Sequence, residues 1–443
     1  MTSREFGSFS LQLVLLLWAA HVCGYVMTRL RQPRVVGEIL GGLILGPSVL
    51  GRAFPAAAAV LVPDPASGRQ ALEYGAVLGF LSHLGLVLLM FASGVETKRL
   101  FRRDEWRAIG WLAGVGTGLP FLAAIAASPF IPTESLGGAA DNHTALLLVI
   151  GIAVAVTSIP VISKIFHDLG ILHTRFAGLV LGVAVVEDAV LWGVLAVATS
   201  LAASVALPSS GIAAHVAAVL LYFALGLTVL PRVVHWTTRA GWNVVARHGP
   251  VAWIVTVLFA YTAAASALDV NLVFAAFLAG YALATEPELN DATTTLNKVS
   301  FAIFIPLYLA IIGFQLDLTK TFSPRLVLGV LILACGLKLA SAGMAARLAG
   351  FRWRDSVNLS IALNARGGPG IIVATVAYDA AIINAEFFTA LLVLAIATSQ
   401  AAGAWLDYVI RRGSPLLSEP TTAVISDATA RANPRAPGSI SPP

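Results

Sequence analysis

Two adjacent carboxylates, Glu187 and Asp188, lie in the middle of an apolar run from about residue 175 to residue 207. A charged side chain at the centre of a bilayer costs roughly 3 kcal/mol on insertion scales, so a charge held in a membrane span indicates a function. A buried carboxylate can hold a hard cation through its oxygens, or it can bind a proton. These two reactions are the chemistry that the pair suggests.

Two further stretches interrupt apolar runs, one in each half of the chain. The first contains Thr157 and Ser158, whose hydroxyls could offer oxygen atoms to a cation. The residues that we expect to form the two helix breaks are Pro160 in the first stretch and Asn364, Arg366, Gly367, Gly368 and Pro369 in the second. A lone proline or glycine kink is common in membrane helices and need not mark a site. Two interrupted helices in separate halves of the chain favour a transporter binding site where two repeats meet.

Lys338 lies within another apolar run, at 324–346. If the run that holds the acidic pair crosses from inside to outside, Asp188 lies roughly 20 Å above its inner end at 1.5 Å per residue. Lys338 lies roughly 14 Å above the inner end of its own run. A lysine side chain can cover this difference, so we expect Lys338 to pair with Glu187 or Asp188, which lowers the cost of burying either charge alone. The alternative is that Lys338 extends to the inner interface.

The composition places these residues in a membrane protein. The chain has 443 residues, of which 58% are hydrophobic and only 12% are charged, and membrane-length apolar runs recur throughout. We predict an all-α polytopic fold of about thirteen transmembrane helices. The predicted spans are 8–28, 36–50, 76–94, 108–130, 144–164, 175–205, 213–231, 249–268, 271–286, 298–316, 324–346, 355–379 and 386–409.

The distribution of Lys and Arg predicts the orientation of these spans. With the N-terminus outside, 19 of the 28 Lys and Arg residues fall in inner segments and only 5 fall in outer ones. Cytoplasmic loops carry such an excess, so we expect an integral plasma-membrane protein with its N-terminus outside and its C-terminus inside. The basic residues are spread over short loops and form no patch, so we expect no nucleic-acid partner.

The remaining organisation is simple. We predict one transmembrane domain over 1–412 and a disordered cytoplasmic tail over 413–443, which is rich in Pro, Ser, Thr and Ala. Cys23 and Cys335 lie far apart within apolar runs and indicate neither a disulfide framework nor a metal site. We find no nucleotide fingerprint and expect no cofactor.

These motifs resemble the monovalent cation:proton antiporter-2 superfamily with its sodium/hydrogen exchanger domain. The resemblance extends from about residue 10 to residue 410. It rests on the order of the matching segments, which are Gln32–Gly51, Gly94-Val95-Glu96, Thr157-Ser158-Ile159-Pro160-Val161, the acidic pair, Ile305-Pro306-Leu307-Tyr308 with Gly313, and Lys338.

The resemblance implies a fold with inverted repeats, a mobile core domain, a dimerisation domain and homodimers in lipid. It also implies two crossed, unwound helices that the acidic pair faces. Asp188 then matches the position that carries the ion or the proton, with a transient Na⁺ or K⁺ bound there. Glu96 is a candidate for the cytoplasmic funnel, whereas Glu38 could line the funnel or lie at the interface. Arg366 could balance Glu96 or the ends of the broken helices.

The sequence departs from the family at Glu187, where members usually carry Asp, Asn or Gln. In the family this first position correlates with the number of protons exchanged and with pairing to the lysine that matches Lys338. The ligand-gated potassium efflux members carry Gln-Asp at the pair, so the chain resembles that branch less.

We therefore expect a secondary antiporter that exchanges a monovalent cation, Na⁺ or K⁺, for protons by alternating access. Binding of the cation and of the proton at one site would exclude each other, and that exclusion couples the two fluxes. A passive cation channel or an efflux component is the alternative, and a channel would be open to both sides at once. We expect no enzyme, because adjacent helical residues diverge by about 100° and do not flank one substrate bond.

Overall fold

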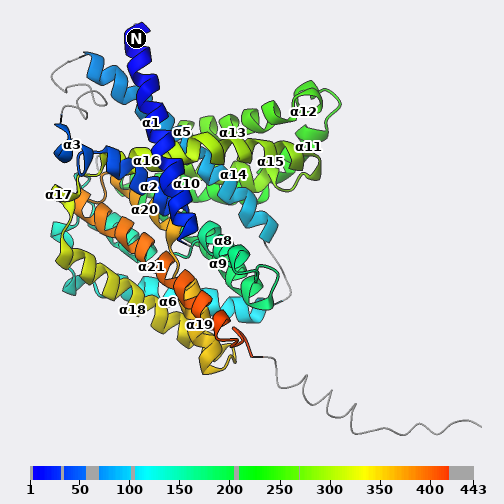
Figure 1. The fold of residues 1–443 in the computed structure, drawn as a ribbon. Helices are drawn as coiled ribbons and strands as arrows, with labels where there is room; N and C mark the ends of the chain where they lie inside the picture. The colour runs from blue at the N-terminus through cyan, green and yellow to red at the C-terminus, as the bar shows by residue number, and fades with distance from the viewer. Residues whose placement is uncertain are drawn as a thin grey trace, which may run out of the picture.

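The computed structural model describes residues 3–30, 34–55, 69–100, 105–203, 209–268 and 270–418. Nearly all of these residues lie in helices, and the β-pairing among them is one isolated bridge between Gly137 and Ile383. The predicted all-α fold is therefore confirmed (Figure 1).

Nine helices in the described ranges are long and apolar enough to cross a membrane, and eleven if each of two bent pairs counts as one span. The nine spans are formed by α1 (Ser3–Arg29), α2 (Arg34–Leu45) with α3 (Leu50–Ala53), α5 (Arg69–Leu100), α6 (Trp106–Ala126), α9 (Arg175–Ala203), α13 (Pro250–Ala267), α15 (Asn290–Val299) with α16 (Ile305–Gln315), α18 (Pro324–Leu348) and α21 (Ala385–Arg411). The bent pairs are α10 (Ser209–Thr228) with α11 (Leu230–Arg239), and α19 (Trp353–Leu363) with α20 (Gly367–Asp379). The chain is thus an integral multi-pass membrane protein.

The predicted number of thirteen spans is not confirmed by these criteria. Two apolar helices that fall in predicted spans, α7 (His143–Ala155) and α14 (Leu272–Leu283), have only 13 and 12 residues. A helix needs about 20 residues to cross the hydrocarbon core. In the first case the reason is visible, because α7 ends at a break and the chain continues as α8 (Ile159–Asp168).

The helices pack in two groups (Figure 1). One group, which we call the core group, contains α6, α7, α8, α9 and α18 to α21, and α18 packs against both α6 and α19. The other, which we call the scaffold group, contains α1, α2, α5, α13, α14 and α16. All the predicted site residues except Glu38 and Glu96 belong to the core group.

Four glycines of the scaffold group mark close crossings between helices from the two halves of the chain. A Cβ atom on Gly42 of α2 would lie 1.8 Å from a carbonyl oxygen of α16, and one on Gly313 of α16 would lie 2.0 Å from a carbonyl oxygen of α2. Gly94 of α5 and Gly280 of α14 approach each other's helices in the same reciprocal way, at 2.0 Å and 2.1 Å. Each pair joins a helix of the first half to one of the second half, so only glycine fits at these crossings.

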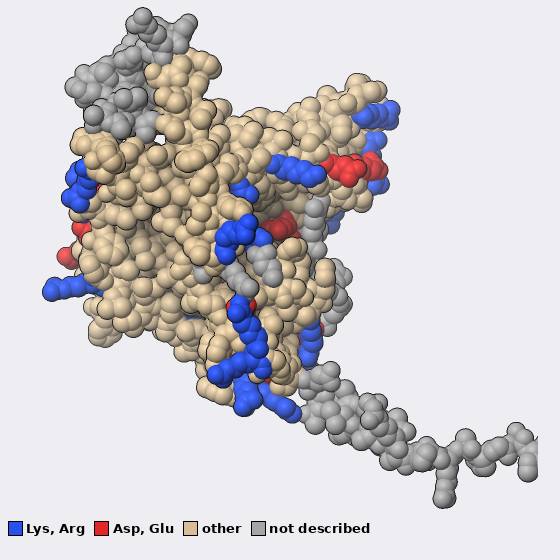
Figure 2. All heavy atoms as spheres, viewed as in Figure 1, with Lys and Arg blue, Asp and Glu red and all other residues tan. Residues whose placement is uncertain are grey.

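The surface agrees with a membrane environment. Uncharged residues cover most of the face in Figure 2, and charged side chains gather at a few places, including the ends of α19 and α21. Residues 413–418 lie against α19, because Ser418 donates its N–H and its hydroxyl to Asp355 Oδ1, each at 3.0 Å. The rest of the predicted tail, 419–443, lies outside the described residues.

Candidate functional site

The acidic pair lies at the middle of α9, and both side chains are buried, with 1% of Glu187 and none of Asp188 exposed. Glu187 Oε1 accepts a hydrogen bond from Lys338 Nζ of α18 at 2.9 Å. It also accepts one from the hydroxyl of Thr117 of α6. The structure therefore pairs Lys338 with Glu187, one of the two partners considered from depth in the membrane. Lys338 Nζ also donates to the carbonyl of Ala155, the last residue of α7, at 2.5 Å.

Asp188 differs sharply from its neighbour. Neither of its carboxylate oxygens has a hydrogen bond of good geometry among the described residues, although the indole of Trp192 lies beside it, and Glu187 Oε2 likewise has none. Buried polar atoms in proteins are nearly always paired, and an orphaned one costs about 1–3 kcal/mol or more when it is charged. A cation bound at Asp188 would coordinate these oxygens, and a proton would remove their charge.

The two helix breaks lie side by side near the acidic pair. Helix α7 ends at Ala155 and α8 begins at Ile159, whereas α19 ends at Leu363 and α20 begins at Gly367. The N–H of Ser158 donates to the carbonyl of Ala365 at 2.7 Å, which joins one break directly to the other. The two unwound segments therefore meet, as the resemblance implies.

The hydroxyls of the first break stabilise the backbone. Thr157 Oγ1 donates to the carbonyl of Leu363 at 2.5 Å, and Ser158 Oγ accepts from the N–H of Val161 at 3.3 Å and caps α8. Both side chains are fully buried. Each oxygen has a remaining lone pair, so a role as cation ligand is compatible with these bonds.

The prolines act differently from the sequence expectation of a kink inside a helix. Pro160 is the second residue of α8 and Pro369 is the third of α20. In the first turn of a helix the missing N–H removes no intrahelical hydrogen bond. The free carbonyls at the crossing arise because α7 and α19 end there. Gly367 adopts φ +37°, and a Cβ on it would lie 2.3 Å from Val161 Cγ2, so this position requires glycine.

Arg366 binds the ends of the broken helices. Its guanidinium donates to the carbonyls of Ala153 at 2.8 Å, Val154 at 2.7 Å and Ala334 at 2.9 Å. It also donates to Asn364 Oδ1 at 2.7 Å, and it is 1% exposed. The positive charge therefore faces the negative, carboxyl-terminal end of α7.

A cavity of about 410 Å³ leads from one end of the molecule toward the crossing. Glu38 and Glu96 both line it, and so do Gly368 and Pro369 at the start of α20. Glu38 is 4% exposed and accepts a hydrogen bond from Arg34 Nε at 2.8 Å. Of the two sequence alternatives, the structure thus places Glu38 on the cavity wall.

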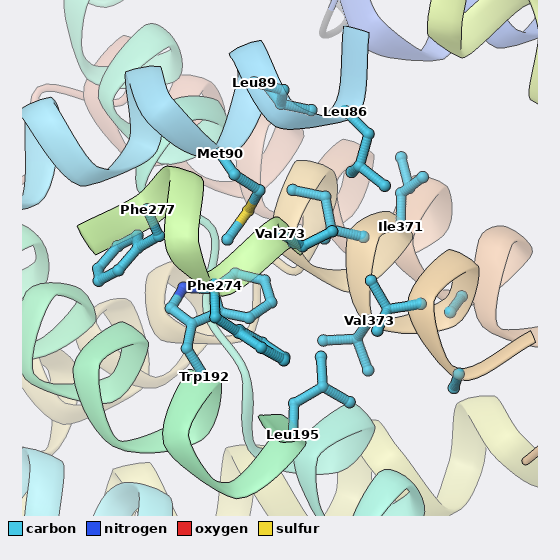
Figure 3. Packing of buried hydrophobic residues seen from close by; sticks show 14 of the residues in the cluster. Leu86, Leu89, Met90, Trp192, Leu195, Val273, Phe274, Phe277, Ile371 and Val373 are labelled. Atoms are coloured by element: carbon cyan, nitrogen blue, oxygen red, sulfur yellow. The ribbon is translucent and has the colours of Figure 1, made fainter. Parts of the chain in front are cut away.

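Beyond Asp188 along α9, apolar side chains pack around Trp192 (Figure 3). Phe274 and Phe277 of α14 lie close to Trp192 of α9, one helical turn after Asp188, and to Met90 of α5. All four side chains are fully or almost fully buried. The site is therefore sealed on this side and approached by a cavity on the other.

Sequence reasoning did not single out Thr117 or Arg34. Thr117 lies in an otherwise apolar helix, and its contact joins residues 70 positions apart. Only the crossing of α6 and α9 brings them together, so no local pattern marks it.

Comparisons with known proteins agree with this geometry. A family model described as "Sodium/hydrogen exchanger, transmembrane" matches residues 17–412. The chain is 28% identical over 401 residues to Cation/H(+) antiporter 18 of Arabidopsis thaliana, covering 88% of this chain and 47% of that protein, so it spans about half of that relative. It is 24% identical over 386 residues to the Probable Na(+)/H(+) antiporter GerT of Bacillus cereus, covering 87% of this chain and 95% of GerT. The solved structure of the sodium proton antiporter MjNhaP1 from Methanocaldococcus jannaschii matches with a TM-score of 0.57 at 13% identity, over 91% of this chain and 97% of that chain, which shows a shared fold.

Proposed function

Because this chain belongs to the sodium/hydrogen exchanger family, we propose that it is a secondary antiporter that exchanges a monovalent cation, Na⁺ or K⁺, for protons. The observation that carries the proposal is Asp188, a fully buried carboxylate without a hydrogen bond of good geometry among the described residues. It lies beside two joined helix breaks, with a cavity on one side and packed side chains on the other. The names of the relatives, which include sodium and cation antiporters, support the same activity.

The mechanism follows from exclusive binding at Asp188. A cation held by the carboxylate, with oxygens from Thr157, Ser158 and the crossing, prevents protonation, and a proton prevents cation binding. Each ligand drives the exchange only through its different interaction with the two states. Glu187 and Lys338 form a buried ion pair beside this site, and Arg366 and Asn364 hold the helix ends that frame it.

We further propose that the cavity with Glu38 and Glu96 is the cytoplasmic funnel, so that the structure is an inward-facing state. This places the N-terminus outside and the C-terminus inside a plasma membrane, in agreement with the Lys and Arg distribution. We propose a homodimer in lipid, with the scaffold group forming the dimerisation domain and the core group the mobile core domain.

Asp188→Asn tests the proposal. In everted vesicles the wild-type chain should collapse a preformed pH gradient when Na⁺ or K⁺ is added, and Asp188→Asn should remove this response without loss of membrane insertion. Cation-dependent proton movement that survives the substitution would overturn the proposal. A cation flux that moves no protons would favour a passive channel, which the sealed side of the site argues against.

A further inference from the structure

Thr117 is a buried threonine whose hydroxyl donates its hydrogen bond to a residue of another helix. Threonines within membrane helices commonly donate to the carbonyl three or four residues earlier, and Thr199 of α9 does so to Ala196 at 3.0 Å. Thr117 is 7% exposed and instead donates to Glu187 Oε1 across the gap between α6 and α9. A hydroxyl has a single proton, so this donation replaces the usual local bond.

The sequence of α6 explains how Thr117 reaches the acidic pair. Gly116, beside Thr117, packs on α18, where a Cβ would lie 3.4 Å from the Cα of Ala342, an ordinary van der Waals contact. Pro120 within α6 has no N–H for the Gly116 carbonyl, and Ser341 of α18 lies 3.5 Å from that carbonyl oxygen. The same helix pair therefore carries both donors to Glu187, Thr117 on α6 and Lys338 on α18.

We propose that Thr117 is a positioning residue that holds Glu187 Oε1 toward Lys338 throughout the exchange cycle. The inference rests on the proposed function. The charged groups in electrostatic reach of Glu187 are Lys338, Arg366 and the adjacent Asp188. Thr117 carries no charge, so its hydrogen bond persists when Lys338 loses its proton, whereas the ion pair does not.

The Glu side chain gives this arrangement its geometry. Both donors bind the same oxygen, Oε1, whereas Oε2 has no partner among the described residues. Thr117 and Glu187 both line a cavity of about 370 Å³ between α6 and α9. Thr117 therefore fixes which carboxylate oxygen faces Lys338 and which has no partner.

Three variants test the proposal. Thr117→Val removes the donor at nearly constant volume, Thr117→Ser restores it, and Thr199→Val is the matched control of a buried threonine with a local hydrogen bond. A hydrogen bond to a charged group is worth roughly a factor of ten or more, so Thr117→Val should lower the rate of cation-driven proton transport about tenfold, and it should have a smaller effect when combined with Lys338→Gln. Thr117→Ser and Thr199→Val should leave the rate near that of the wild type.

Thermal unfolding of the purified protein in detergent tests the same inference without any transport. Residues that bind the same oxygen are expected to be coupled, so the effects of Thr117→Val and Lys338→Gln on the melting temperature should not add. The effects of Thr199→Val and Lys338→Gln should add. If Thr117→Val does not fold, Thr117→Ala gives the same comparison.

Effects of Thr117→Val and Lys338→Gln that simply add, or a Thr117→Ser variant that behaves like Thr117→Val, would overturn the role of Thr117. Wild-type protein that moves no protons in response to cations would overturn the proposed antiport function instead. The unfolding measurement would still decide the role of Thr117.

Discussion

Lys338→Gln is the substitution that most directly tests how the buried charges work together. Lys338 Nζ and Glu187 Oε1 are 2.9 Å apart, and both side chains are fully buried. Removing one partner of a buried pair typically costs about 3–5 kcal/mol, because a charge is left uncompensated. The glutamine amide and Thr117 can still donate to Glu187, so we expect a loss near the lower end, about 3 kcal/mol. Melting temperatures of the detergent-solubilised variants would measure it.

Lys320→Gln is the matched control for this stability measurement. Lys320 also forms an ion pair, with Asp317 at 3.2 Å, but its side chain is 81% exposed. Exposed pairs contribute about 0–1 kcal/mol, so the control should melt almost like the wild type. A Lys338→Gln protein as stable as Lys320→Gln would contradict the view that Glu187 depends on Lys338.

The same substitution should change the response of exchange to membrane potential. If cation binding at Asp188 breaks the pair and releases a proton from Lys338, two protons move for each cation, and one net charge crosses the membrane. A potential of 100 mV then contributes about 2.3 kcal/mol per cycle, or about 50-fold in the gradient that exchange can sustain. Lys338→Gln should exchange one proton per cation and lose this contribution.

Reconstituted protein with a clamped potassium-diffusion potential, driven by a Na⁺ gradient, separates the two schemes. The wild-type rate should rise or fall with the sign of the potential, and the rate of Lys338→Gln should not. A wild-type rate that ignores the sign would refute the two-proton scheme and leave Glu187 and Lys338 as a fixed structural pair. A Lys338→Gln rate that still follows the potential would exclude Lys338 as the second proton carrier.

Two substitutions at the crossing give further tests. Thr157→Val removes the hydrogen bond to the Leu363 carbonyl, so it should destabilise the protein by about 1–3 kcal/mol. It should also weaken apparent cation affinity several-fold more than it lowers the maximal rate. An unchanged affinity in transport assays would mean that the hydroxyl only stabilises the break. Gly367→Ala should clearly lower the melting temperature, because φ is +37° there and the new Cβ would lie 2.3 Å from Val161. Gly368→Ala is the control: its Cβ would have nothing within 4 Å, so it should destabilise the protein by no more than about 1 kcal/mol. Equal melting temperatures for the two alanine variants would contradict this reading of the crossing.

The sequence predicted those site residues whose burial in a membrane costs free energy that other groups must offset. A charge in a long apolar run is expensive, so Glu187, Asp188 and Lys338 could be singled out, and helix rise alone placed the lysine near the acids. Glycine and proline weaken a helix locally, so these residues marked the second break in the sequence. The position of the prolines at helix starts was not predicted, because sequence periodicity does not show where a helix ends before a break.

The contacts that the sequence did not reveal all depend on which helices cross. Thr117 and Glu187 are 70 residues apart, and Arg366 contacts carbonyls more than 200 positions away on α7. Arg366 had two possible roles in the sequence, and the structure gives it the helix ends because their dipoles converge at the crossing. Glu38 likewise had two possible places until the packing of α2 put it on the cavity wall.

The distribution of the site between the two helix groups bears on how access could alternate. Glu187, Lys338, Thr117 and both helix breaks belong to the core group, so the hydrogen bonds that define the site cross no boundary between the groups. The apolar seal does cross it, since Phe274 and Phe277 of the scaffold group meet Trp192 of the core group (Figure 3). The cavity with Glu38 and Glu96 also lies between the groups. A rigid displacement of the core group could therefore separate Trp192 from α14 and close the cavity while the geometry around Asp188 stays intact, which is the kind of motion that inverted-repeat transporters use.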